Sequence, residues 1–567
     1  MKKPTRGLLL VIMARQRLSG VFPLLLIFFL LIVFSVQASA QASSKLVVIA
    51  IDSLDPGYLY LDARGNAGGR PGNWLMPNVR AFIDGGVWFE HTRDYLPSAT
   101  DMNHLNALAG TNSGQHGILM VTNQLFDWND DGTPNNVFSS LDWTRDDQGR
   151  PVDTLFKAWK RVYPESTIMF ASGKEWIENE FNTADSGIDL FLSGANYPDY
   201  ISAPEKRSFY NPPGMIPVAP SLWQVIFCEY LYGSSPEKFP SDYWMVDSSL
   251  KIMNREKPDF VFMLLAECDD LQHGLGSARN PKDFSLITDI AKNNAYVYRK
   301  PIINGMKDVD IQFGKLIAGI RSMPEYQDAV IVLYSDHGHL THNYTAASNV
   351  VFSTNVDNIL RDKGVISDEE KSYVNYQALT GASFGQIWFN RTTLAERRAV
   401  AARAKTVLVD HRVFNPQTGR MECPWYVLDI NDMKNGVPGV CGPGELYHPH
   451  FADNNEPGTL HWPDITLLLK NGWQLPATAG LANNIGASLP SWLPPLNYFL
   501  GGHGSIDSMS IVMAFQGPGM KIGKVNADPA YAKNYRIADI AVTLAEIFGL
   551  ELRSTTVGID RSTDLNW

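Results

Sequence analysis

Six acidic and histidine residues stand where the chain leaves apolar runs, and their side chains are the ones best suited to chemistry. These residues are Asp52, Asp269, His273, Asp336, His337 and His503. Carboxylates and imidazoles without neighbouring thiolates form a donor set that suits Zn²⁺ with an open coordination position, or Mn²⁺. The sequence therefore predicts a metal centre, which would also supply positive charge for a small anionic substrate.

The spacing of these residues strengthens that prediction. Asp269 and His273 are four residues apart, so they would lie on one side of a helix if the chain is helical there. Asp336 and His337 are adjacent, and the glycine that follows them allows close approach of the backbone. His503 stands in a Gly-Gly-His-Gly segment, which would expose its imidazole.

The elements that must position these residues are unbroken apolar runs rather than alternating ones. The runs cover residues 45–51, 166–170, 259–266, 329–334 and 510–515. Such runs are typical of strands that are buried on both faces. Helical patterns over 152–161, 308–322 and 537–548 lie between or after them. We therefore predict an α/β fold with a mostly parallel central sheet flanked by helices, in which ligands bind beyond the carboxyl ends of the strands.

The ends and the long intervals of the chain predict its domain organisation. Residues 1–40 combine a basic start, an apolar run over 24–34 and an Ala-Ser-Ala cleavage pattern, as a secretory signal peptide does. Residues 41–567 would form one catalytic domain, with inserted cap segments at 175–255 and 341–500. We expect an exported protein, periplasmic or secreted, without a stable membrane span after cleavage; an uncleaved segment would anchor it.

Net charge limits the partners that the chain could bind, and the cysteine positions indicate which thiols could pair. Loss of the five cations in residues 1–40 takes the net charge from −11 to −16, which argues against nucleic acid or an acidic membrane as a general partner. Cys423 and Cys441 lie in a loop-like segment and could form a disulfide in an oxidising compartment. Cys268 lies inside an apolar run and is expected in the core. The sequence does not define the oligomeric state.

Several motifs in order resemble the alkaline phosphatase superfamily, and within it the type I phosphodiesterase/nucleotide pyrophosphatase family. They are Asp52 after the first strand, the Pro97-x-x-Thr100 turn with Asn103 and a later His-Gly-Ile, Asp269-x-x-x-His273, Ser335-Asp336-His337-Gly338 and Gly501-x-His503-Gly504. The resemblance covers residues 45–125, 259–340 and 500–560. It implies an alkaline-phosphatase-like fold and a metal-dependent hydrolase of phosphate esters, with a small phosphorylated substrate.

The resemblance also implies roles for individual residues. One zinc ion would be held by Asp269, His273 and His503. The other would be held by Asp52, Asp336, His337 and the hydroxyl oxygen of Thr100. Thr100 would be the nucleophile of a phospho-threonine mechanism, because binding to a metal lowers the pKa of an oxygen ligand. Asn123 would donate to a phosphoryl oxygen.

Two neighbours of Thr100 bear on the substrate. Nucleotide-cleaving members of the family usually carry a lysine immediately before the nucleophile, where this chain has Ala99. Asp101 follows Thr100, and an acidic side chain there would disfavour highly charged nucleotides. A phosphodiester is the expected substrate, and a phosphomonoester or a phosphonate is the alternative. An alternative of another class is a non-catalytic envelope binding protein on the same fold.

Overall fold

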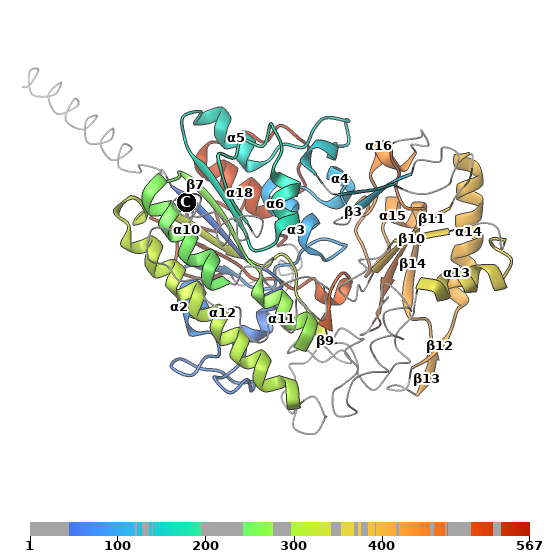
Figure 1. The fold of residues 1–567 in the computed structure, drawn as a ribbon, viewed down its shortest axis with the longest axis horizontal. Helices are drawn as coiled ribbons and strands as arrows, with labels where there is room; N and C mark the ends of the chain where they lie inside the picture. Colours follow the sequence, from blue (N-terminus) through green and yellow to red (C-terminus); the bar gives the residue numbers. More distant parts are fainter. Residues whose placement is uncertain are drawn as a thin grey trace, which may run out of the picture. The chain divides into compact units, whose positions relative to one another are not determined.

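The computed structural model places an eight-stranded sheet at the centre of the chain (Figure 1). It describes residues 45–119, 122–126, 135–138, 140–193, 242–275, 296–341, 353–367, 372–375, 384–389, 391, 393–415, 419–453, 459–470, 473, 501–525 and 535–567. The expected signal peptide at 1–40 lies outside these residues. Across the sheet the strands are ordered β19 (Gly523–Val525), β2 (Val87–Phe89), β18 (Met513–Gln516), β8 (Val330–Tyr334), β1 (Leu46–Ile51), β7 (Phe260–Leu265), β5 (Ile168–Ser172) and β6 (Leu190–Ser193).

The sheet is mostly parallel, as predicted. Strands β8, β1, β7, β5 and β6 run parallel to one another, whereas β18 is antiparallel to both of its neighbours. Each of the five apolar runs overlaps a strand of this sheet, and the strands that match 166–170 and 510–515 extend past the ends of those runs. Strand β18, which corresponds to the run 510–515, begins at Met513 rather than at Ser510, because Ser510 forms a bridge with Arg93 and the backbone of Val512 bonds Ser335.

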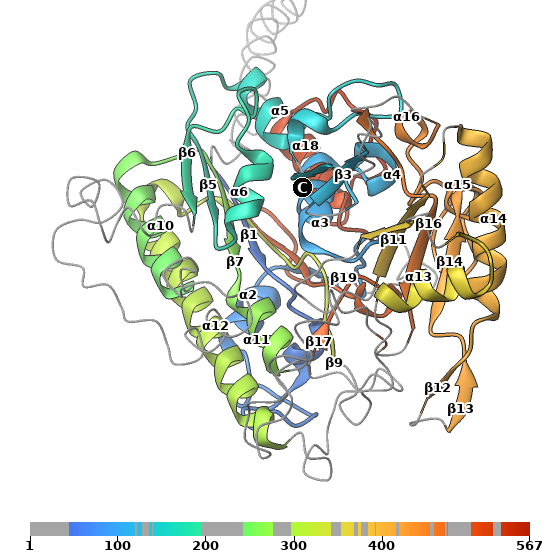
Figure 2. The same cartoon turned by 45° about the vertical axis from the view of Figure 1, so that its right-hand side comes forward.

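Both faces of the sheet are buried, which is why its strands are apolar throughout. In β1, Leu46, Val48 and Ala50 face one hydrophobic cluster, while the alternate residues face another. Helices α3 (Thr100–Ala109), α5 (Leu155–Val162) and α18 (Asp539–Phe548) contribute to the first cluster. Helices α2 (Pro77–Asp84), α10 (Asp242–Glu256) and α12 (Tyr296–Ser322) contribute to the second (Figures 1 and 2).

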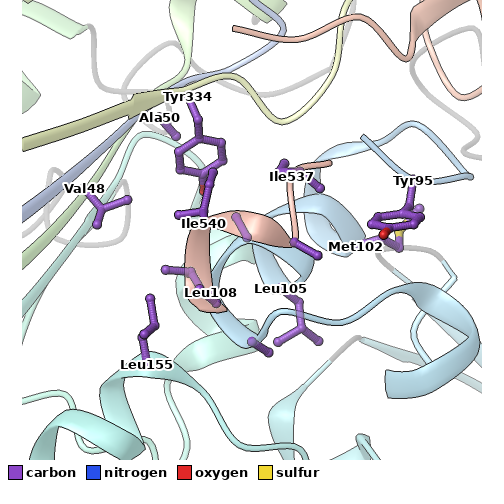
Figure 3. Close-up of a cluster of buried hydrophobic side chains, with 14 of the residues drawn as sticks. Val48, Ala50, Tyr95, Met102, Leu105, Leu108, Leu155, Tyr334, Ile537 and Ile540 are labelled. Atoms are coloured by element: carbon purple, nitrogen blue, oxygen red, sulfur yellow. The ribbon is translucent and has the colours of Figure 1, made fainter. Parts of the chain in front are cut away.

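Helix α3 is held in the first cluster by its apolar side chains. Leu105 and Leu108 lie beside Ile537 and Ile540, the latter from α18, as the close-up shows (Figure 3). The helix ends at Gly110, which adopts a left-handed conformation with φ 71°. The first residue of α3 is Thr100, so this packing fixes the residue that the sequence singles out.

A second sheet lies within the interval 341–500. It is antiparallel, and its strands are ordered β10 (Ser372–Asn375), β11 (Phe384–Phe389), β16 (Ile465–Leu469) and β14 (Trp425–Asp429). Helices α13 (Ser353–Asp362) and α14 (Leu394–Asp410) cover it with a separate hydrophobic cluster. The other predicted insertion, 175–255, has its described ends in the central layers, because β6 pairs with β5 and α10 packs in the second cluster.

Smaller elements complete the described part. They are β3 (Thr122–Phe126), β4 (Asn135–Phe138), β9 (Leu340–Thr341), β12 (Val413–Asn415), β13 (Arg420–Glu422), β15 (Thr459–Leu460), β17 (Gly501–Gly502), α4 (Ser113–His116), α6 (Glu175–Phe181), α11 (Glu267–Leu275), α15 (Ile430–Asn435) and α16 (Pro449–Ala452), with short 3-10 helices at Pro56–Tyr60, Leu141–Trp143, Pro324–Tyr326 and Ile506–Ser508. Within the described ranges, every helix is too short or too polar to cross a bilayer.

The possible disulfide between Cys423 and Cys441 is not formed in the structure, where both residues carry free thiols. Cys423 packs against the cluster of the second sheet, and its Sγ lies 3.2 Å from the carbonyl oxygen of Trp425. Cys441 belongs instead to the first cluster. The two side chains therefore pack in different hydrophobic clusters. Cys268 is fully buried in the core, as predicted.

The burial of both sheet faces predicts a large cost for truncating a central strand. Leu264 in β7 is completely buried, so Leu264→Ala should lower the free energy of unfolding by about 2–5 kcal/mol. Ile522→Ala is the control, because Ile522 is 70% exposed and should change stability by less than about 0.5 kcal/mol. Urea unfolding followed by circular dichroism measures the free energy of unfolding of both variants. Equal values would contradict the burial of both faces of the sheet.

Candidate metal centre and active site

Four neighbouring parallel strands end at one edge of the central sheet, and the residues that follow them meet there. Across the order β8, β1, β7 and β5, these residues are Asp336 with His337, then Asp52, then Asp269, then Lys174. All five are buried. The carboxyl edge of the sheet is thus lined by three carboxylates, one imidazole and one ammonium group, as the position of ligand sites in such sheets predicts.

Helix α11 brings Asp269 and His273 together. The helix spans Glu267–Leu275, so the two residues are one turn apart, as predicted. The Nε2 atom of His273 lies 3.3 Å from Oδ2 of Asp269.

His503 reaches the site from a distant part of the chain. Strand β17 pairs with β9, and Gly504 forms a bridge with Ser98. The imidazole of His503 stacks on that of His337 with ring centroids 3.8 Å apart. Gly504 has φ +113°, and a Cβ atom there would stand 2.2 Å from the ring of Phe384, so only glycine fits this turn.

Thr100 stands at the first position of α3 and is only 3% exposed. Its Oγ1 atom lies 3.2 Å from Nε2 of His337 and 3.3 Å from Nζ of Lys174. The backbone N–H groups of the first helical turn point toward this end of the helix and favour negative charge. A hydroxyl at this position is therefore close to groups that can stabilise an anion.

The segment before Thr100 is tied to α3 by side-chain hydrogen bonds. Asn103 donates through Nδ2 to Asp94, which also accepts from the hydroxyl of Ser98. Oδ1 of Asn103 accepts from the backbone of Tyr95 at 3.2 Å and from Asn106. Asn103 therefore ties the segment before Thr100 to the helix.

The hydrogen bonds of two histidines define their tautomers. Nδ1 of His337 lies 3.0 Å from the carbonyl oxygen of Gly338, and Nδ1 of His503 lies 2.9 Å from that of Ser98. A carbonyl oxygen can only accept, so each Nδ1 carries the proton and each Nε2 presents a lone pair to the site. This arrangement is typical of histidines that bind a metal through Nε2.

These lone pairs face carboxylate oxygens. Nε2 of His337 lies 3.3 Å from Oδ2 of Asp336 and 3.6 Å from Oδ1 of Asp52. Neither of these two buried oxygens accepts a hydrogen bond from the described residues. Buried acceptors that face one another are unfavourable unless a cation lies among them. The donor set therefore fits a divalent metal.

Three groups of side chains are close enough to hold such an ion. Their members are Asp52, Asp336 and His337; Asp269, His273 and His503; and Asp269, His337 and His339. The first two groups are the two triads implied by the family resemblance. The third contains His339, which sequence analysis missed although it follows His337 by two residues.

Burial sets the protonation of the imidazoles. It lowers the pKa of His337 and holds the pKa of His503 well below its usual value, so both rings are neutral at neutral pH. Burial also lowers the pKa of His339 to about 3. Neutral imidazole is the form that binds metal ions, so burial keeps these residues ready to act as ligands.

The carboxylates respond to burial in different ways. Burial, followed by the charge of Asp336, raises the pKa of Asp52. Burial opposes ionisation of Asp269 as well, but His273 and Lys174 hold its pKa well below the usual value. Burial raises the pKa of Asp101 to about 7, so the acidic neighbour of Thr100 is partly neutral at neutral pH. It therefore repels an anion less than its residue type suggests.

Lys174 is the second residue that sequence analysis missed. Its signal was the same as for the carboxylates, because it follows the apolar run at 166–170 in the segment Ser172-Gly173-Lys174. Asn123 lies in β3, where it pairs with Val137, and its side chain lies outside the described part.

Comparisons with known proteins identify the family of the chain. The family model described as type I phosphodiesterase/nucleotide pyrophosphatase matches residues 46–505. The structure resembles murine ectonucleotide pyrophosphatase/phosphodiesterase 5, with a TM-score of 0.52 and 14% identity over 92% of this chain and 99% of that one. An inactive variant of the murine protein has been solved in complex with AMP. No curated protein matches the chain.

A second likeness is to phosphonoacetate hydrolase from Sinorhizobium meliloti 1021 in complex with phosphonoacetate. Its TM-score is 0.51, with 14% identity over 88% of this chain and 94% of that one. At this identity both likenesses concern the fold, and the family model carries the assignment. The chain belongs to the type I phosphodiesterase/nucleotide pyrophosphatase family and is a phosphoric ester hydrolase.

Proposed function

We propose that this hydrolase works with two divalent metal ions, expected to be Zn²⁺ with Mn²⁺ as the alternative, and that Thr100 is its nucleophile. One observation carries the proposal: two triads of metal-binding side chains converge on a buried threonine whose Oγ1 lies 3.2 Å from His337. The non-catalytic alternative would be favoured by loss of a ligand, yet all six candidate ligands are present and close together.

The proposed ligands follow the two triads. Asp269, His273 and His503 would hold one ion, and Asp52, Asp336 and His337 would hold the other, with Oγ1 of Thr100 completing its coordination. When bound, the metal ions supply positive charge that favours the alkoxide form of threonine and stabilises the oxygens of an in-line displacement.

The reaction consists of two displacements at phosphorus. In the first, Oγ1 of Thr100 bonds to phosphorus and the bond from phosphorus to the leaving oxygen breaks. In the second, water attacks the phosphorus of the phospho-threonine, the bond from phosphorus to Oγ1 breaks and the threonine hydroxyl is restored; a diester substrate thereby yields a phosphomonoester, and a monoester yields phosphate. The N–H groups at the start of α3 stabilise the negative phosphoryl group. We assign to Asn123 a hydrogen bond to a non-bridging phosphoryl oxygen.

The proposed substrate is a small phosphate ester, with a phosphodiester first because of the family. A phosphomonoester or a phosphonate is the second candidate, because Ala99 replaces the lysine that precedes the nucleophile in nucleotide-cleaving members. We propose that the second sheet and its helices form the cap that selects the substrate, and that residues 1–40 direct export.

Removing the proposed nucleophile tests the mechanism. Thr100→Ala should lower kcat toward bis-p-nitrophenyl phosphate and p-nitrophenyl phosphate by at least about 10³-fold. Acid quenching with a labelled substrate should trap label on the wild type and none on the variant. Thr100→Ser is the matched control, because it keeps a hydroxyl and should retain label. Equal activity of Thr100→Ala and wild type would refute the assignment.

Metal removal tests the two triads. A chelator should lower the melting temperature, and added Zn²⁺ at about 100 times its Kd should restore about 2.7 kcal/mol of stability. Asp336→Asn should reduce the metal content measured by mass spectrometry and the response to Zn²⁺, while Asp142→Asn on the surface should leave both unchanged. A wild-type protein that contains no metal and does not respond to it would contradict the site.

The proposed signal peptide predicts a defined processing site. Protein exported by a secretion-competent host should begin at Gln41, as read by N-terminal sequencing. Replacing the small residue before the cleavage site, as in Ala40→Leu, should leave residues 1–40 attached. A mature protein that retains its original N-terminus would show that the segment acts as an anchor instead.

A further inference from the structure

Lys174 is the cation nearest to the proposed nucleophile among the described residues, and its position suggests more than a structural role. It stands between β5 and α6 at the carboxyl edge of the sheet and is 3% exposed. Its Nζ atom lies 2.7 Å from Oδ2 of Asp52 and 2.7 Å from Oδ2 of Asp269. Each of these carboxylates belongs to a different triad, so the ammonium group sits where the two triads meet.

Local hydrogen bonds and close packing hold the turn that carries Lys174. Its backbone N–H donates to Oγ of Ser172 at 3.1 Å, and that hydroxyl donates to the carbonyl oxygen of Lys174 at 2.7 Å. A Cβ atom on Gly173 would stand 2.8 Å from Cβ of Ala266, so this turn packs closely on the end of β7. The backbone of Lys174 is therefore held at the edge of the site by local bonds that do not depend on the charge of its side chain.

A buried ammonium group needs anionic partners. When Asp52 and Asp269 act as metal ligands, their charge is shared with divalent ions that also repel the ammonium group. Another anion must then satisfy Lys174. Its Nζ atom is 3.3 Å from Oγ1 of Thr100, so the non-bridging oxygens of a phosphoryl group attached there come within hydrogen-bonding reach.

The charge of Lys174 bears on which phosphoryl groups the site prefers. A phosphodiester carries one negative charge at its phosphorus. A phosphomonoester, whose second pKa is about 6, carries close to two at neutral pH. A compact ammonium ion beside the phosphoryl oxygens stabilises the second charge.

We propose that Lys174 is a catalytic residue that binds the phosphoryl oxygens and raises the preference of the site for dianionic groups, as in phosphomonoesters and phosphonates, over monoanionic diesters. This inference rests on the proposed function of Thr100 and the two triads. The aliphatic stem contributes no such preference, so removal of the charge alone should change it.

The test compares two substrates in variants of Lys174. Lys174→Met should lower kcat/KM for p-nitrophenyl phosphate about 10- to 100-fold more than for bis-p-nitrophenyl phosphate, as expected for loss of a hydrogen bond to a charged group. Lys174→Gln keeps a donor without the charge and should show the same change in ratio if the methionine variant does not fold. Lys521→Met, on the exposed surface, should leave the ratio unchanged.

A binding measurement separates this inference from the proposed function. Calorimetry with inorganic phosphate on metal-loaded protein should show about 10- to 100-fold weaker binding to Lys174→Met, with metal content equal to that of wild type. Unchanged phosphate affinity and an unchanged substrate ratio would overturn the role of Lys174 and leave it as a counter-ion of the carboxylates. If Thr100→Ala is fully active while Lys174→Met binds phosphate weakly, the proposed mechanism fails and the phosphate site stands.

Discussion

The candidate site depends on a concentration of buried electron-pair donors at one edge of the sheet. Asp52, Asp269 and Asp336 are all buried, and the Nε2 lone pair of His337 faces carboxylate oxygens at 3.3 and 3.6 Å. Such an arrangement is costly without positive charge, because the interior screens repulsion poorly. Lys174 supplies part of this positive charge. Divalent metal ions bound by the carboxylates and imidazoles would supply the rest.

The scaffold makes this concentration possible by burying both faces of the central sheet. Helices on each face hold β8, β1, β7 and β5 in register, and the chain leaves all four strands at the same edge. Side chains placed after the strands therefore converge without long loops. The same packing holds α3, whose apolar side chains are buried in the first cluster. Thr100, the first residue of this helix, is therefore held close to the carboxylates.

The proposed chemistry unites these features. The helix terminus and Lys174 approach Thr100 from the protein side, while the two triads would bring the metal charge. The family places this chain among the phosphoric ester hydrolases. Within that class we propose that the charge around Thr100 selects the phosphoryl group, because the fold is shared with proteins named for nucleotides and for a phosphonate.

The sequence by itself determined the fold class, the central strands and the residues that converge at their ends, because apolar runs and the residues that follow them are local features. Lys174 and His339 also follow apolar runs, but their part in the site became evident only from the side chains that the fold places beside them. Tertiary structure also decided that Cys423 and Cys441 stay apart, because they pack into different cores. It alone brought His503 onto His337, since this contact depends on the pairing of β17 with β9 and not on any spacing along the chain.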